Sequence, residues 1–241
     1  MAAYAPGMAT VILARHGRTA SNAGGILAGR TKGIHLDDTG VAQARAAGAR
    51  LEGLALAAVV TSPLERCRET ARLMAPDVRP VSDRQLLECD YGEWTGQEIK
   101  KLAKEKLWRT VQAQPSGARF PGGESLQEMS ARVVSGVRAR DAAIEEETGD
   151  HAVWLVISHG DPIKAILADA LGMHLDAFQR ITVDPGNLSV VRYTPHRAFV
   201  LTMNSAEGSL SHLAGKPRKR RTRPSDAVVG GGAGPSTAAP A

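Results

Sequence analysis

Apolar positions along the chain fall into short runs separated by longer segments of mixed polarity. The first run, residues 10–14, reads TVILA and is too short for a helix, so it predicts a buried strand. Similar runs predict strands or extended pieces at residues 57–60, 78–81, 86–88, 152–157, 188–193 and 198–203, of which 152–157 is the most apolar. The segments between them predict helices at residues 39–53, 62–74, 97–111, 124–147 and 163–171.

Capping residues mark the expected ends of these helices. Thr39 suits the N-cap of one helix, and Gly149 ends the longest one. Ser62 suits the N-cap of another, with Pro63 at its first helical position and Glu65 completing a capping box. Loops are expected at residues 20–36, 90–96 and 114–123, which are rich in glycine, proline or small polar residues.

Strands and helices alternate through residues 10–204, which is typical of one α/β domain. We expect a three-layer sandwich in which a mostly parallel sheet has helices on both faces. The last two strands are joined by a short turn and predict an antiparallel element at one edge of the sheet. Residues 1–9 are expected to form a flexible N-terminus, with Met8 as an alternative start. Residues 205–241 predict a disordered, basic tail rich in glycine, proline and alanine.

Composition narrows the class of protein. Hydrophobic residues make up 43% of the chain, enough for a packed globular domain, and aromatic residues only 4%. Residues 1–9 lack the features of a secretory signal, and no apolar run approaches the roughly 20 residues of a membrane helix. Cys67 and Cys89 show neither metal nor redox spacing, so we expect reduced thiols in a cytoplasmic protein, with a disulfide as the alternative. No cysteine, histidine or aspartate cluster has metal-ligand spacing, so no metal is expected. No other cofactor is expected either.

The charge is unevenly distributed. The net charge is +5, which invites a nucleic-acid interpretation. Residues 205–241 contain six basic and two acidic residues, so they hold +4 of this charge and leave only +1 for residues 1–204. The folded body is therefore not expected to bind nucleic acid, and a contact through the basic tail is the remaining alternative.

Polar residues follow the predicted strands, at the edge where an open α/β sheet binds ligands. Arg15-His16-Gly17 comes directly after the first strand, and Thr19 and Asn22 follow at short spacing. Three further motifs stand at strand ends or in loops: TSPLERCRET at residues 61–70, LECDYGEWTG at 87–96 and VISHG at 156–160.

These four motifs, in this order, resemble the signatures of the histidine phosphatase superfamily in its phosphoglycerate-mutase-like branch. The resemblance covers residues 10–203 and implies that His16 is a nucleophile that forms a phosphohistidine and that Glu88 is the proton donor. Asp90 and Glu93 are the neighbouring carboxylates that compete with Glu88 for this role. The resemblance implies phosphate contacts for Arg15, Asn22, Arg66, His159 and Gly160.

The implied roles make physical sense together. A transferring phosphoryl group spreads negative charge over three oxygens, and arginine forks match such oxygens and stay charged. The helix that begins near Gly160 favours an anion at its N-terminus. His16 can attack phosphorus when it is neutral, and we expect a backbone carbonyl to hold the proton on its other ring nitrogen. Burial could raise the pKa of Glu88 enough for it to act first as acid and then as base. No metal is required, because the arginines neutralise the charge.

Other charged residues have no such context. Arg68 is expected to be solvated, since it lies two positions from Arg66 on the same helix. Residues 29–40 depart from the usual family pattern, so Arg18 and Arg30 are candidates for substrate contacts, with surface exposure as the equal alternative. The five remaining histidines are expected to be structural or exposed: His35, His151, His174, His196 and His212.

The family contains both phosphatases and mutases. Glu88 and His159 are 71 residues apart, which resembles the shorter phosphatase form, and residues 121–125, PGGES, also resemble that branch. The basic residues of the segment between Glu88 and His159 are expected to form a solvated helix face: Lys100, Lys101, Lys104, Lys106 and Arg109. We therefore expect a metal-independent phosphomonoesterase acting on small phosphorylated metabolites. A phosphoglycerate-type phosphomutase and an inactive phosphoester-binding module are the alternatives.

Overall fold

A six-stranded sheet is the centre of the computed structural model, which describes residues 9–149 and 151–213. Its strands are β1 (Thr10–Arg15), β2 (Leu56–Thr61), β3 (Val81–Ser82), β4 (Val153–Ser158), β5 (Leu188–Tyr193) and β6 (Ala198–Ser205). Their order across the sheet is β3-β2-β4-β1-β5-β6. The first four in this order are parallel, and β5 pairs antiparallel with both β1 and β6.

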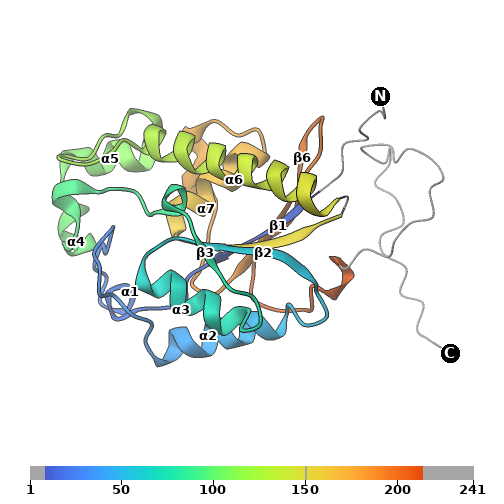
Figure 1. Cartoon of the computed structure of the whole chain (residues 1–241). Coiled ribbons are helices and arrows are strands. Elements are labelled where there is room, and N and C mark those ends of the chain that lie inside the picture. Colours follow the sequence, from blue (N-terminus) through green and yellow to red (C-terminus); the bar gives the residue numbers. More distant parts are fainter. Residues whose placement is uncertain (1–8, 150, 214–241) are drawn as a thin grey trace.

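Helices cover both faces of the sheet. They are α1 (Ala20–Ala23), α2 (Asp38–Ala49), α3 (Glu65–Met74), α4 (Ile99–Leu102), α5 (Lys106–Ala113), α6 (Leu126–Thr148) and α7 (Gly160–Ala170). Short 3-10 helices lie at Arg84–Leu86, Gly92–Trp94, Pro115–Gly117, Leu175–Arg180 and Ser211–Leu213. Figure 1 shows α2 and α3 on one side of the sheet and α6 and α7 on the other. The predicted three-layer sandwich, with its antiparallel element at one edge, is confirmed.

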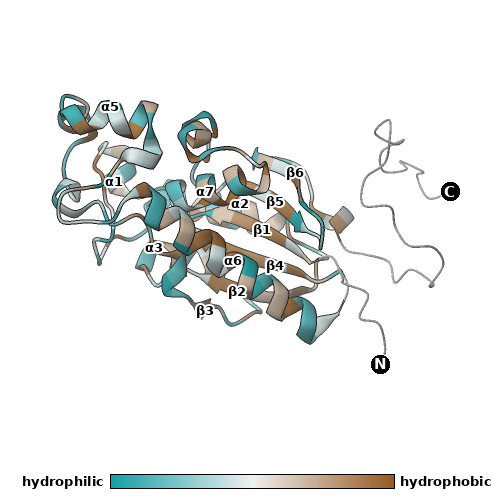
Figure 2. Cartoon of the chain, turned by 90° about the horizontal axis from the view of Figure 1, so that it is seen from above, coloured by the Kyte–Doolittle hydropathy of each residue, from teal (hydrophilic) through white to brown (hydrophobic). Residues whose placement is uncertain are grey.

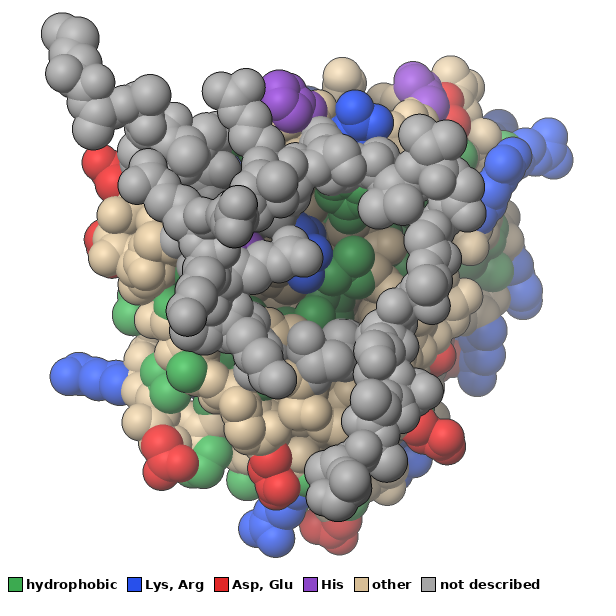
Figure 3. Space-filling view, turned by 90° about the vertical axis from the view of Figure 1, so that its right-hand side faces the viewer, with side chains coloured by type: hydrophobic (Ala, Val, Ile, Leu, Met, Phe, Trp, Pro, Cys, Tyr) green, Lys and Arg blue, Asp and Glu red, His purple; other side chains and the backbone are tan. Residues whose placement is uncertain are grey.

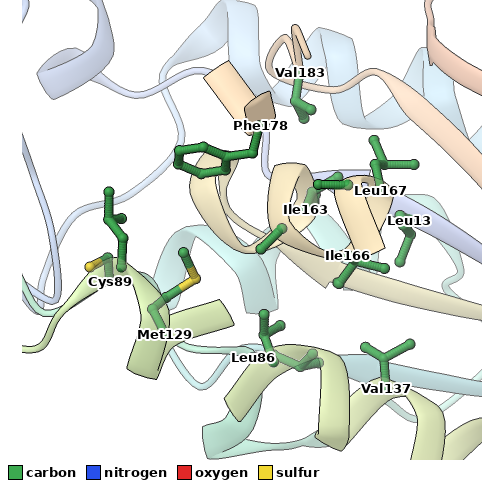
Figure 4. Close-up of a cluster of buried hydrophobic side chains, with 14 of the residues drawn as sticks. Leu13, Leu86, Cys89, Met129, Val137, Ile163, Ile166, Leu167, Phe178 and Val183 are labelled. Atoms are coloured by element: carbon green, nitrogen blue, oxygen red, sulfur yellow. The ribbon is translucent and has the colours of Figure 1, made fainter. Parts of the chain in front are cut away.

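The central strands supply two cores, because successive side chains of a strand point to opposite faces. In β1, Val11 and Leu13 belong to the core beneath α6 and α7, and Ile12 and Ala14 belong to the core beneath α2 and α3. Figure 4 shows Leu13 in the first core, among side chains of α6 and α7. In Figure 2 the hydrophobic colour is concentrated on β1 and β4. Burial on both faces explains why these strands are continuous apolar runs in the sequence.

One carboxyl group lies in the α6 side of the core. Asp141 of α6 is 3% exposed, and its Oδ1 accepts a hydrogen bond of 2.7 Å from Trp154 Nε1 of β4. Burial raises the pKa of Asp141 to about 6, although the Trp154 bond acts in the opposite direction.

Several predicted helix starts were wrong. The N-cap of α2 is Asp37 rather than Thr39, since the Asp37 side chain accepts from Gly40 N at 2.8 Å. The N-cap of α3 is Leu64, without a side-chain hydrogen bond, so the capping box predicted from Ser62 does not form. Ser62 is not free for it because its hydroxyl bonds a buried histidine.

Other elements also differ from the prediction. The helix predicted at residues 97–111 is two helices, α4 and α5, and the break lets residues from both reach one cavity. The piece predicted as extended at 86–88 follows a 3-10 turn, Arg84–Leu86, which is closed by the Asp83 side chain bonding Gln85 N. The predicted loop at 20–36 contains α1, where Thr19 and Asn22 form a reciprocal capping box.

The folded domain continues past residue 204, where the sequence predicted a disordered tail. Arg50 donates hydrogen bonds to the carbonyl oxygens of Ser205, Glu207 and Gly208. Leu210 and Leu213 are buried at the end of this segment. The predicted boundary is therefore too early, because these contacts join residues 205–213 to α2. The rest of that tail, 214–241, and residues 1–8 of the predicted flexible N-terminus lie outside the described residues.

The end of the molecule that lies at the right of Figure 1 has mixed charge. Figure 3 shows acidic and basic described side chains spread around this end.

Candidate active site

Three neighbouring strands end side by side at the carboxyl edge of the sheet. β4 lies between β1 and β2, and the residues that follow these strands are His159, His16 and Ser62. Backbone hydrogen bonds continue the pairing, from His16 N to Ser158 O at 3.0 Å and from Ser62 N to Ile157 O at 2.9 Å. The sheet order thus brings together three buried polar side chains that are far apart in the sequence.

His16 is held as a neutral imidazole. Its Nδ1 lies 2.7 Å from the carbonyl oxygen of Gly17, and since a carbonyl only accepts, Nδ1 bears the proton. A backbone carbonyl was the expected partner. Burial lowers the pKa of His16, and the positive charges of Arg66 and Arg15 lower it further. Nε2 therefore keeps its lone pair. The turn after β1 is tight, because a Cβ on Gly17 would lie 2.4 Å from the Gly40 carbonyl oxygen.

Arg66 of α3 connects the two histidines. It is 2% exposed, and its Nε donates to His16 Nε2 at 3.3 Å. Its NH2 lies 2.7 Å from Gly29 O and 3.2 Å from His159 Nδ1. Thr70, one turn further along α3, accepts from Gly17 N at 3.1 Å. Helix α3 thus positions both the arginine and the turn that follows β1.

Arg15 lies against the N-terminus of α7. Its NH1 donates to Val183 O at 2.6 Å, whereas its buried Nε has no hydrogen-bond partner among residues 9–149 and 151–213. The Arg15 guanidinium is 3.7 Å from the point where a Cβ on Gly160 would stand. The guanidinium therefore lies within van der Waals reach of the start of the helix, where backbone N–H groups favour an anion.

His159 is fully buried and reaches the cluster through Arg66. Arg66 donates to Nδ1, so the ring proton lies on Nε2, which donates to Ser62 Oγ at 2.8 Å. Burial, and then the charge of Arg66, lowers the pKa of His159. The His16 and His159 ring centroids are 5.2 Å apart. Both nitrogens of His159 are engaged within the protein, so its expected direct contact with phosphate stays a prediction.

Glu88 faces the same cavity. Its Oε1 accepts from Cys89 N at 3.0 Å, and the side chain lines the cavity with Arg15, His16 and Arg66. Removal from bulk water and the nearby Asp161 raise the pKa of Glu88 to about 7.

Asp90 and Glu93, the two carboxylates considered in place of Glu88, do not line this cavity. Asp90 bonds Gly92 N and Arg30, and Glu93 is exposed. The geometry therefore favours Glu88 of the three.

The cavity has a volume of about 450 Å³, and its lining combines charged, polar and apolar side chains. Arg15, His16, Arg66 and Glu88 are among the charged and polar ones. Apolar and aromatic side chains also line the cavity, among them Ile26, Leu27, Tyr91, Trp94, Ile99, Trp108, Val111, Phe120, Ile181 and Val183. Thr19 and Asn22 also line it, although the Asn22 Oδ1 is occupied by Thr19 through the capping box.

Arg18 and Arg30 do not line the cavity. Arg18 donates to Asp37 at 2.8 Å on a half-exposed surface. Arg30 donates to Glu88 O at 2.9 Å and to Glu124 at 2.8 Å, so it braces the backbone that holds Glu88. Arg18 therefore forms a surface ion pair, and Arg30 supports the backbone at Glu88.

The remaining sequence expectations fall outside the site. Arg68 is exposed, as are His35, His151, His174 and His196. Cys67 and Cys89 are free and buried. Within residues 9–149 and 151–213, no cluster of three or more histidine, cysteine, aspartate or glutamate side chains is arranged to hold a metal ion. No helix of the described part of the chain is long and apolar enough to span a membrane.

Sequence reasoning missed several supporting residues. Ser62 was assigned to a helix cap, although it bonds His159, and the role of Thr70 has no local signal. Asp161 accepts from the Tyr91 hydroxyl at 2.9 Å and is 3.5 Å from Lys164 Nζ. The position of Asp161 directly after the SHG motif was the one available signal for it.

The fold and the two-histidine edge of the sheet define a phosphoglycerate mutase-like α/β protein. A family model confirms the relationship at the level of sequence: the chain belongs to the histidine phosphatase superfamily (branch 1), whose model matches residues 11–206. The predicted family is therefore correct.

Relatives within this family have different names. A probable phosphoglycerate mutase of Yersinia pestis is 30% identical over 212 residues, which is 86% of this chain and 95% of the relative. The α-ribazole phosphatase structure of Shigella flexneri is 26% identical and superimposes with a TM-score of 0.71, covering 82% of this chain and 96% of that one. A mycobacterial glucosyl-3-phosphoglycerate phosphatase shares the fold, at 22% identity and a TM-score of 0.73, over 82% of this chain and 99% of the other.

Proposed function

We propose that this protein is a metal-independent phosphomonoesterase that transfers a phosphoryl group first to His16 and then to water. The main support is the pair of arginines at the base of the cavity. Among the described residues, neither Arg15 nor Arg66 forms an ion pair with a carboxylate, and Arg66 is almost fully buried. A buried cation is costly unless it is compensated, and a phosphate dianion would compensate both guanidinium groups.

In the first step, His16 Nε2 attacks phosphorus and the bond to the ester oxygen breaks. The Gly17 carbonyl holds the Nδ1 proton and stabilises the positive charge that develops on the ring. Arg15 and Arg66 hold the phosphoryl oxygens, and Gly160 N–H at the start of α7 adds a donor. Protonated Glu88 gives its proton to the departing alcohol oxygen, so the alcohol leaves neutral.

In the second step, the Glu88 carboxylate takes a proton from water as the water oxygen attacks phosphorus. The bond from His16 Nε2 to phosphorus breaks, and inorganic phosphate and neutral His16 are released. A carboxyl group whose pKa is raised to about 7 is suited to both steps, because both of its protonation states are well populated near neutral pH.

Hydrolysis is favoured over mutase chemistry by the charges in the cavity. A phosphoglycerate-type mutase must hold a carboxylate or a second phosphate in addition to the reacting group. Of the described residues that line the cavity, Lys164 is the one further cation; it is 3.5 Å from Asp161 and donates to Gln179 at 3.0 Å. Asp161 and Asp184 add negative charge to the same cavity. The basic residues of α4 and α5 are exposed, so they do not supply the missing cation.

The test is phosphate release from a panel of phosphomonoesters in the presence of EDTA. The variants compared are wild type, His16→Ala and the matched control His35→Ala, which removes an exposed histidine outside the cavity. We expect release by wild type and His35→Ala, and none by His16→Ala. Acid-labile phosphate bound to the wild-type protein after rapid quenching in alkali would identify the phosphohistidine.

The name of the Yersinia relative makes the mutase the second candidate. Interconversion of 3-phosphoglycerate on addition of 2,3-bisphosphoglycerate, without hydrolysis of any ester, would establish the mutase and overturn the proposal. No turnover in either assay would favour a phosphoester-binding module.

A further inference from the structure

Aromatic side chains are scarce in this chain but are concentrated at the cavity. The sequence contains nine phenylalanine, tryptophan and tyrosine residues, of which eight lie in the described part of the chain, and four of these eight line this one cavity: Tyr91, Trp94, Trp108 and Phe120. They come from three separate segments of the chain, so no local sequence pattern explains their meeting. Tyr91, Trp94 and Phe120 are buried in the hydrophobic core, and Trp108 packs against that core beside the cavity.

The four rings form one connected surface. Trp94 and Trp108 are stacked, with centroids 6.1 Å apart and an interplanar angle of 26°. Phe120 meets Trp94 edge-on at 5.3 Å and Tyr91 at 5.0 Å. Trp94 is 6% exposed and anchors the group, whereas Trp108 of α5 is only partly buried and keeps contact with the cavity. A flat ligand ring could therefore pack against Trp108 without rearrangement of the buried rings.

The charged residues that line the cavity limit which alcohol part of a substrate it can accept. Arg15 and Arg66 face the place proposed for the phosphoryl group, and Lys164 is already paired with Asp161. A leaving alcohol that carries a carboxylate would therefore meet Asp161 and Asp184 without a further unpaired cation among the described lining residues. A small polar alcohol would make no contact with the apolar side chains of the lining. An uncharged ring avoids both costs.

We propose that the preferred substrates are phosphate monoesters of uncharged alcohols that contain a flat aromatic ring, which packs against Trp108 while the phosphate lies at His16. This inference rests on the phosphatase function proposed above and specifies its leaving group. The apolar residues around the rings, such as Ile99 and Val111, extend the same contact surface.

The test compares esters of equal intrinsic reactivity. 2-Phenylethyl phosphate and ethyl phosphate both release a primary alcohol, so a difference in kcat/KM reports recognition of the ring. We expect wild type to prefer the phenyl ester by about tenfold or more, which corresponds to about 1.4 kcal/mol. Glycerol 3-phosphate should also be preferred over 3-phosphoglycerate, which has an added carboxylate. Equal kcat/KM for the phenyl and ethyl esters would overturn the inference while leaving the phosphatase function intact.

Substitutions of Trp108 test whether this side chain causes the preference for the phenyl ester. Trp108→Leu should lose most of the preference for the phenyl ester, and Trp108→Phe should retain part of it. Phe199→Leu is the matched control, because Phe199 is a partly buried aromatic residue of β6 that does not line the cavity, and it should keep the wild-type ratio. An equal loss on both esters in Trp108→Leu would contradict the proposed contact. If that variant does not fold, the wild-type ratio alone decides.

A binding measurement separates failure of this inference from failure of the proposed function. 2-Phenylethylphosphonate and ethylphosphonate cannot be hydrolysed at the carbon–phosphorus bond, and their affinities can be compared by calorimetry. If no ester is hydrolysed but the phenyl phosphonate binds at least tenfold more tightly, the aromatic site stands and the hydrolase proposal fails. Equal affinity of the two phosphonates would refute the aromatic site directly.

Discussion

Replacement of Glu88 by glutamine tests the acid–base step of the proposed mechanism. Glutamine keeps nearly the same shape and can still accept the hydrogen bond from Cys89 N, so the local backbone should be preserved. It cannot give a proton to the leaving alcohol. General acid–base catalysis contributes about 10²- to 10⁴-fold, so kcat/KM for an alkyl ester should fall by this factor, equivalent to about 3 to 5 kcal/mol.

The choice of leaving group distinguishes acid catalysis from general damage. Nitrophenolate departs without protonation, so phosphorylation of His16 by 4-nitrophenyl phosphate should be much less affected than by an alkyl ester. The second step still lacks its base, and the phosphohistidine should accumulate. Stopped-flow absorbance should therefore show a burst of about one nitrophenolate per protein molecule followed by slow turnover.

The pH dependence supplies an independent check. Because the pKa of Glu88 is raised to about 7, the acid form persists to near-neutral pH and is lost as the pH rises further. Wild-type kcat/KM for the alkyl ester should decrease above about pH 7, and Glu88→Gln should lack this decrease. Asp90→Asn and Glu93→Gln are the controls and should behave as wild type. Equal losses on the alkyl and nitrophenyl esters, or an unchanged pH profile, would refute the role of Glu88.

Three further predictions concern the surroundings of the site. Ser62→Ala leaves the buried Nε2–H of His159 without its acceptor, so urea unfolding should show a loss of about 1–3 kcal/mol; an unchanged midpoint would contradict the bond. Asp141→Asn keeps an acceptor for Trp154 and removes a buried carboxyl whose folded pKa, about 6, lies above its unfolded value. The unfolding free energy of wild type should therefore fall relative to that of this variant as the pH rises from about 4 to 6, by roughly 2 to 3 kcal/mol. If the unfolding free energies of the two proteins change in parallel with pH, the raised pKa of Asp141 is refuted. Burial raises the pKa of Cys67 to about 12, so thiol reagents at pH 8 should label it only after unfolding, and rapid labelling of the native protein would be the contrary result.

The sequence was most informative where a side chain follows directly from a strand end. Arg15, His16 and His159 could be placed at one edge because they stand within two residues of the end of an apolar run. Ser62 follows β2 in the same way, but Ser-Pro is also a strong helix-start signal, and only the position of β4 next to β2 decides between the two roles. Local patterns do not report which strands are neighbours.

The partners of the surface arginines were equally inaccessible. Arg18 and Arg30 are similar in local sequence, yet Arg18 pairs with Asp37 and Arg30 reaches Glu88 O and Glu124. Helical periodicity across residues 97–111 also gave no indication of a break, because α4 and α5 each keep an apolar face. The cluster of four aromatic rings at the cavity depends on the break between α4 and α5, because the break lets Ile99 of α4 and Trp108 of α5 line the same cavity.

The position of β1 has a consequence for how the protein is made. β1 is synthesised first, but both of its neighbours, β4 and β5, come from the C-terminal half of the chain. During translation the backbone hydrogen-bonding groups and the apolar side chains of β1 therefore stay unpaired until β4 and β5 have left the ribosome. Folding that depends on such distant pairings is slow and leaves strand edges open to other chains. We therefore expect truncated chains that end before residue 153 to aggregate, and chaperone supply to influence the yield of soluble protein.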